Sequence, residues 1–133
     1  MKYITHKPRS DGFGSHYKTI MFAILYCKWN NFTYIYRPLT EVAHNYDNDP
    51  LFLEKLENLM NIKPFYKTIN EIQKEIPWVN GKDIIRRIQK HPELLTKETL
   101  KPIKDMYCAN KDHDWYKNGK VNISLHIRKD NKG

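Results

Sequence analysis

Residues 2–36 read KYITHKPRSDGFGSHYKTIMFAILYCKWNNFTYIY, and this stretch decides the fold. Residues 2–6 and 32–36 are short runs containing β-branched and aromatic residues, which is typical of strands. Between them, residues 16–30 are apolar around most of a helical circumference, as in a buried helix. A loop of turn-forming residues, 8–15, joins the first strand to that helix. This order of strand, helix and strand predicts an α/β protein.

Four apolar stripes at helical spacing predict helices in the middle of the chain. Asp49 is a good N-cap and Pro50 suits the first turn of the first of these helices. The second stripe stops at Pro77, the third runs to about His91, and the fourth lies around residues 97–108. The stripes are Phe52, Leu53, Leu56, Leu59 and Met60; Ile69, Ile72 and Ile76; Ile84, Ile85 and Ile88; and Leu100, Ile103, Met106 and Tyr107. We interpret all four as core packing.

The clearest strand of the sequence lies near its end, at residues 121–127. Apolar and polar residues alternate there with a period of two, so one face is apolar and the other carries His126 and Arg128. A polar terminus, 129–133, follows. Because the chain has neither internal repeats nor long linkers, we expect residues 1–133 to form a single α/β domain.

The composition is that of a basic protein with a sizeable core. The 133 residues include 23 Lys and Arg against 15 Asp and Glu, a formal charge of +8, and 40% are hydrophobic. Such a length supports one domain. The longest apolar run, 20–27, is far shorter than the roughly 20 residues of a membrane-spanning helix. No apolar signal segment follows Lys2, so we expect a cytoplasmic protein without a membrane span.

The positive charge suits nucleic acid, anionic lipid or a ligand that carries phosphate. The basic residues are scattered among apolar positions, and this pattern disfavours a nucleic-acid-binding arm. Cys27 and Cys108 are too few for a disulfide framework or a zinc site. Cys27 lies in an apolar run and is best interpreted as a small buried hydrophobic residue.

The loop before the first helix is the first candidate site. Gly12 and Gly14 permit positive φ and a close approach of the backbone to a ligand. The start of the helix offers unpaired N–H groups to a phosphate or carboxylate, and we expect Ser15 to cap it. The same spacing also suits a plain strand-to-helix turn. It is not the full dinucleotide-binding fingerprint, because Tyr17 stands where the third glycine would be.

The end of the last strand is the second candidate site. His126 and Arg128 share a face at the carboxyl end of a strand, where ligands bind in open α/β sheets. The planar guanidinium of Arg128 can hold two phosphate oxygens, while His126 donates to phosphate or positions Arg128. A solvated strand end is the simpler alternative.

Taken together, the two sites resemble motifs of fucosyltransferases with the GT-B fold, in the α1,2-, α1,6- and protein O-fucosyltransferase group. Residues 12–16 resemble that family's Gly-x-Gly-Asn-(Gln/Arg), and residues 125–129 resemble its apolar strand running into His-x-Arg-Arg. Lys129 replaces the second arginine, and Ser15 and His16 replace the Asn-Gln pair. The resemblance implies a Rossmann-like parallel sheet with flanking helices, as in the N-terminal half of a GT-B glycosyltransferase.

The resemblance also implies a glycosyltransferase that binds the nucleotide sugar GDP-fucose through a cationic diphosphate site and uses a glycan acceptor. Arg128 would contact the diphosphate, with support from His126 and with the glycine loop beside the cleft. The substrate-binding residues so implied are Gly12, Phe13, Gly14, Ser15, His126, Arg128 and Lys129. A cationic clamp stabilises leaving GDP without a metal or other cofactor. Because GT-B enzymes have a second Rossmann-like half, we expect an incomplete or inactive enzyme, or a partner chain that supplies that half.

The catalytic base stays unassigned. The loop carboxylates Asp11, Glu41, Asp47 and Asp49 are candidates only by position. The segment 112–114, Asp-His-Asp, combines carboxylate and imidazole groups, but its spacing matches no metal motif, so we interpret it as a polar loop.

Two other function classes stay open. A small basic nucleic-acid-binding protein would lose affinity steeply with salt, although the scattered lysines make nucleic acid the weaker expectation. A non-catalytic interaction module would keep the fold without the chemistry. Asp130, one residue earlier than the acid of the fucosyltransferase motif, agrees with that alternative.

Overall fold

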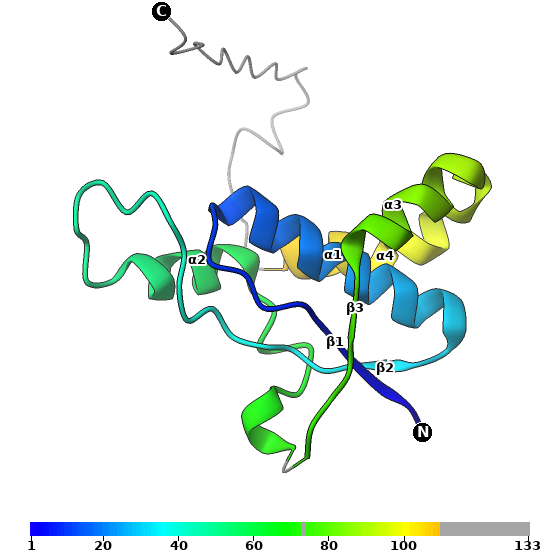
Figure 1. Ribbon diagram of the computed structural model, residues 1–133, viewed down its shortest axis with the longest axis horizontal. Helices are drawn as coiled ribbons and strands as arrows, with labels where there is room; N and C mark the ends of the chain where they lie inside the picture. Colours follow the sequence, from blue (N-terminus) through cyan, green and yellow to red (C-terminus); the bar gives the residue numbers. More distant parts are fainter. Residues whose placement is uncertain (73, 110–133) are drawn as a thin grey trace, which may run out of the picture.

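Strands and helices alternate along the chain in the computed structural model, which describes residues 1–72 and 74–109 (Figure 1). Within these residues, the strands are β1 (Tyr3–His6), β2 (Thr33–Tyr34) and β3 (Trp78–Val79). The α-helices are α1 (Phe13–Asn30), α2 (Phe52–Met60), α3 (Gly81–Lys90) and α4 (Lys97–Cys108). Two short 3-10 helices are η1 (Ile69–Glu71) and η2 (Pro92–Leu94). The protein is therefore mixed α/β, as the sequence predicts.

In the described part of the chain, the strands form a parallel sheet in the spatial order β2-β1-β3. The registers are Tyr3–Thr33 and Ile4–Tyr34 on one side of β1, and Thr5–Trp78 and His6–Val79 on the other. A parallel bridge from Tyr36 to Thr68 extends the pairing beyond β2. The chain thus runs outward from β1 and then crosses to the opposite side of β1. This order is compatible with a Rossmann-like arrangement.

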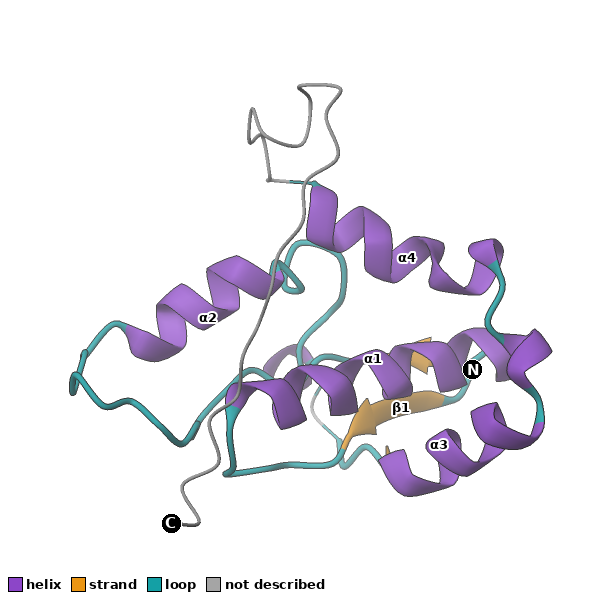
Figure 2. Ribbon diagram, turned by 90° about the horizontal axis from the view of Figure 1, so that it is seen from above, coloured by secondary structure: helices purple, strands orange, loops and turns teal. Residues whose placement is uncertain are grey.

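Helix α1 lies at the centre of the hydrophobic core. Figure 2 shows it alongside β1, with α3 and α4 on its two sides, and it packs against both of these helices. Its buried residues include Ile20, Ala23 and Ile24, and Ile20 is 0% exposed. The helix ends at Asn31, which adopts the left-handed conformation while its N–H donates to the Cys27 carbonyl. The expectation of a buried helix is confirmed, with a start three residues earlier than residue 16.

The two cysteines also agree with the sequence interpretation. Cys27 is buried on α1, Cys108 is exposed, and both are free thiols. Burial raises the pKa of the Cys27 thiol to about 12, so this group stays protonated and packs as a small apolar residue.

Helices α3 and α4 match the predicted third and fourth stripes, whereas α2 begins later than Asp49 and Pro50 suggest. Its first residue is Phe52, with Leu51 at the N-cap. Asp49 instead closes the preceding turn, because its Oδ1 accepts a hydrogen bond from the Leu51 N–H at 2.9 Å.

The prediction of a helix over the stripe Ile69, Ile72 and Ile76 is wrong. Only the single turn η1 forms there, closed by a capping box between Thr68 and Glu71. The physical reason is tertiary pairing, since the Ile69 N–H donates to the Tyr36 carbonyl at 2.9 Å. That bond ties the segment to the sheet, and Ile76 is then buried in extended chain before β3.

Among the described residues, each helix is too short or too polar to cross a membrane. The predicted last strand, 121–127, and the polar terminus after it lie outside the described residues.

The central position of α1 gives a test of the core. We expect Ile20→Ala to lower the free energy of unfolding by about 2–5 kcal/mol, because it leaves a cavity in a side-chain environment closed to solvent. Leu51→Ala is the matched control, since Leu51 is 52% exposed, and it should cost less than about 1 kcal/mol. Urea unfolding followed by circular dichroism measures both, and equal losses would contradict this description of the core.

Candidate functional site

The carboxyl ends of β1 and β3 meet where the order of the strands reverses. β2, the next strand after β1, lies on one side of β1, whereas β3 lies on the other. The loop that begins at Lys7 leaves β1 at the same edge of the sheet where Asn80 leaves β3. In open α/β sheets the crevice outside such a switch point is the usual ligand site.

A crevice of about 320 Å³ opens at this switch point. Its walls come from the loop after β1, from the middle of α1 and from the first turns of α3. Four cationic side chains line it, and we call it the basic crevice: Lys7, Arg9, Lys18 and Lys82. The other lining residues are Thr19, Phe22, Asn80, Gly81 and Ile85. Cations from three parts of the chain therefore converge on one opening.

Three of these four cations have no counter-charge among the described residues. Arg9 is paired with Asp11, with 2.9 Å between Arg9 Nε and Asp11 Oδ1, and its hydrogen bonds lower the pKa of Asp11 to about 2. Lys7, Lys18 and Lys82 form no ion pair with any residue that the structure describes. A concave surface with uncompensated positive charge attracts anions.

The start of α3 adds to the positive potential of the basic crevice. Asn80 is the N-cap of this helix, and its side chain accepts a hydrogen bond from the Lys82 N–H at 3.0 Å. Because α3 follows β3 directly, its positive dipole end faces the carboxyl edge of the sheet. The N-cap at Asn80, the polarity of α3 and the charges of the lining side chains thus all favour an anion at this edge of the sheet.

The predicted glycine loop lies next to the basic crevice along the chain, at the beginning of α1. Gly12 is the N-cap, with φ −67° and ψ 160°, and Phe13, Gly14 and Ser15 form the first turn. Gly12 therefore does not use the positive φ that a glycine permits. A side chain there would instead crowd His44, since an added Cβ would lie 3.2 Å from His44 Cδ2. A close approach of two segments explains the glycine.

The expectation that Ser15 caps α1 is wrong. Its backbone N–H donates to the Gly12 carbonyl at 3.1 Å, so Ser15 already lies inside the helix. The reason is the early start of α1 at Phe13, which moves the cap position to Gly12.

The other predicted site residues, His126, Arg128 and Lys129, lie outside the described residues, as does the segment 112–114. Among the loop carboxylates considered as bases, Asp11 borders the basic crevice through its pair with Arg9. Asp49 is paired with Lys55 at 2.5 Å, before α2. Glu41 and Asp47 are exposed.

Sequence reasoning missed the basic crevice because its cations are far apart in the chain. Lys7 and Lys82 meet only through the pairing of β1 with β3, and β3 has two residues, Trp78 and Val79. The one local signal is Asn80-Gly81-Lys82, an N-cap followed by a helix start.

Within residues 1–72 and 74–109, no cluster of three or more His, Cys, Asp or Glu side chains could hold a metal ion. No protein-family model matches the chain, and neither a curated protein nor a solved structure matches it.

A buried histidine holds the end of β1, directly before the loop that carries Lys7. His6 is 4% exposed, and its Nδ1 lies 2.7 Å from the Tyr34 hydroxyl on the neighbouring strand. Burial lowers the pKa of His6 to about 3, and the positive charge of Arg37 adds to the effect. His6 is therefore neutral at physiological pH and links two strands without adding charge to the site.

This buried histidine makes stability depend on pH. Between pH about 3 and 6.5 the unfolded chain binds a proton at His6 that the folded chain does not. The contribution of His6 to the free energy of unfolding is complete above pH 6.5. It falls as the pH drops, by up to about 1.4 kcal/mol per pH unit. We expect His6→Gln to lower the slope of the free energy of unfolding against pH by the equivalent of about one bound proton. Urea unfolding between pH 4 and 7 measures that slope. The exposed His91→Gln is the control; a wild-type slope in His6→Gln would contradict the assignment.

Proposed function

We propose that the basic crevice binds the phosphate groups of a nucleotide sugar, and that the protein is related to fucosyltransferases with GDP-fucose as its donor. The observation that carries the phosphate site is the convergence of Lys7, Lys18 and Lys82 at the switch point of the sheet. None of the three is paired with an acidic side chain in the part of the chain that the structure describes. The identity of the donor is supported by the motif resemblance of residues 12–16 and 125–129 alone.

The chemistry of fucosyl transfer explains why uncompensated cations would serve here. The acceptor hydroxyl attacks the anomeric carbon and loses its proton, while the bond from that carbon to the diphosphate oxygen breaks. Negative charge builds on the departing GDP, and cations already in place stabilise it. Lys7, Lys18 and Lys82 line the opening from three different segments of the chain, so each ammonium is available to a different phosphate oxygen.

In this proposal the chain corresponds to the N-terminal part of a GT-B glycosyltransferase. The parallel sheet with flanking helices is compatible with that part, and the resemblance adds Arg128 as a further diphosphate contact. A second Rossmann-like half would complete the nucleotide pocket.

One observation favours a nucleic-acid ligand as the second candidate. Lys82, Arg86 and Lys90 are spaced four residues apart on α3 and are all exposed, so they form a basic row along one helix face. Asp83, 3.7 Å from Arg86, offsets part of its charge. Binding to such a row would weaken steeply as salt rises, with a logarithmic slope of about −0.7 to −0.9 for each phosphate contacted. Saturation by one equivalent of a mononucleotide favours the first candidate.

Calorimetric titration of the full chain with GDP and GDP-fucose tests the proposed site. We expect Lys82→Ala and Lys18→Ala each to weaken binding about ten-fold, because each removes a charged hydrogen-bond donor to phosphate. Lys104→Ala on α4 makes the same change of charge away from the basic crevice and should bind like the wild type.

Two results of that titration would overturn the phosphate site. One is the absence of binding by the wild-type chain, and the other is equal weakening by Lys104→Ala and Lys82→Ala. Arg128→Ala is a separate arm that tests the resemblance. If it binds GDP like the wild type, the assignment of Arg128 fails while that of the basic crevice stands.

The ion pair between Arg9 and Asp11 predicts a substitution that strengthens the binding of GDP. Asp11→Asn removes the negative charge that neutralises Arg9, so we expect affinity for GDP to rise about three- to ten-fold. Asp105→Asn, which frees Lys101 on α4, is the matched control and should leave the affinity unchanged. Weaker binding of GDP by Asp11→Asn would show that Arg9 does not face the ligand.

A further inference from the structure

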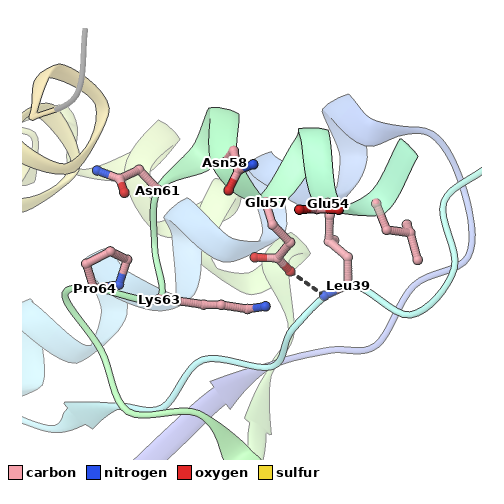
Figure 3. A pocket seen from close by; sticks show the side chains of 8 residues that line it. Leu39, Glu54, Glu57, Asn58, Asn61, Lys63 and Pro64 are labelled. Atoms are coloured by element: carbon pink, nitrogen blue, oxygen red, sulfur yellow. Dashed lines mark hydrogen bonds between the residues drawn. The ribbon is translucent and has the colours of Figure 1, made fainter. Parts of the chain in front are cut away.

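A second hollow, of about 740 Å³, lies between α2 and the chain segments that follow β2 and α2 (Figure 3). One wall is α2 and its C-terminal end, with Glu54, Glu57, Asn58 and Asn61. The other wall includes Leu39 and Lys63. We call this site the α2 hollow, and it shares no lining residue with the basic crevice.

The carboxylate of Glu57 is only half satisfied in this hollow. Its Oε1 accepts hydrogen bonds from the Tyr36 hydroxyl at 2.7 Å and from the Leu39 N–H at 2.8 Å. Burial raises the pKa of Tyr36, so its hydroxyl keeps the donated proton. Oε2 is covered from solvent and has no hydrogen-bond partner in the described part of the chain. Buried acceptors without a hydrogen bond are rare and lower the stability of the fold. A ligand that donates a hydrogen bond to this oxygen would therefore be stabilising.

Three donor side chains, Asn58, Asn61 and Lys63, line the same hollow, and none of them donates a hydrogen bond to this oxygen. Figure 3 shows Lys63 extending across the hollow toward Glu57, yet the two side chains form no ion pair within 4.0 Å. Asn58 presents its amide on the α2 wall, and Asn61 is held in place by a bond from its Nδ2 to the Met106 carbonyl at 3.3 Å. Lys63 and Asn58 are exposed and line the same hollow as Glu57, so their side chains can turn toward a ligand there.

The mixture of groups selects the chemical class of the ligand. Glu54 and Glu57 repel phosphates and carboxylates, and an apolar ligand would leave the amides and the lysine unpaired. Sugar hydroxyls both donate and accept, while the ring C–H groups can pack on Leu39, Leu53 and Pro64. The volume lies within the usual range of small-ligand pockets.

We propose that the α2 hollow binds a neutral sugar, with Glu57 Oε2 accepting a hydrogen bond from one hydroxyl and with Asn58 and Lys63 donating to others. Its role as the acceptor site of a glycosyltransferase rests on the proposed function, whereas sugar binding itself does not.

Saturation-transfer difference NMR on the full chain tests the proposal, with methyl β-galactoside and N-acetylglucosamine at millimolar concentration as neutral probes and inorganic phosphate as the competitor. We expect signal transfer to at least one of the sugars, without competition from phosphate. Glu57→Gln should weaken binding about five-fold or more. This variant keeps an oxygen for Tyr36 and Leu39 but places an N–H donor at the position of Oε2. Glu75→Gln, outside the hollow, is the matched control and should bind like the wild type.

Absence of signal transfer to both sugars, or unchanged binding by Glu57→Gln, would overturn the proposal. If circular dichroism shows that Glu57→Gln does not fold, the exposed Asn58→Leu replaces it, and unchanged binding by that variant is equally contradictory. The failure of the proposed function is distinguishable, because Lys82→Ala should lose GDP affinity and keep sugar binding. Loss of sugar binding in Lys82→Ala would contradict two separate sites.

Discussion

The parallel pairing of β1 with a strand on each side is the constraint on which the rest of the structure depends. His6 lies opposite Val79, so the loop that leaves β1 and the helix that follows β3 start from one edge of the sheet. α1 then covers the sheet with an apolar surface centred on Ile20, and α3 and α4 pack against it. Lys7 and Lys82, distant in the sequence, are neighbours of the same crevice for this reason.

Buried polar contacts connect this frame to the two sites. The neutral His6, which directly precedes Lys7 of the basic crevice, joins β1 to β2 through the Tyr34 hydroxyl. Tyr36, just after β2, donates to Glu57 and fixes that carboxylate on α2 beside the second hollow. The two sites have opposite character, since one gathers uncompensated cations and the other mixes carboxylates with amides. A protein that brings an anionic donor to a neutral acceptor needs such a pair of sites, and the proposed glycosyltransferase function uses both.

Sequence reasoning predicted the elements whose periodic pattern is long. The apolar surface of α1 and the stripes of α3 and α4 determine those helices locally, and the β-branched run of residues 2–6 marks β1. It failed where tertiary pairing overrides a local pattern, as at Ile69, whose N–H pairs with Tyr36 and not within a longer helix. The two-residue strand β3 after Pro77 is too short to show a period.

The basic crevice could not be predicted from the sequence, because no local pattern links Lys7, Lys18 and Lys82. Of the predicted site residues, Gly12 to Ser15 lie at the start of α1, and His126 to Lys129 lie outside the described residues.

In the proposed function, an anionic ligand binds where β1 and β3 end side by side. Amide proton–nitrogen correlation spectra of the full chain, recorded during a titration with GDP, test it most directly. We expect the largest shifts on residues 7–12 and 80–83, with α4 and the α2 hollow unaffected. Shifts centred on α4 or α2, or spread evenly over the exposed lysines, would contradict it.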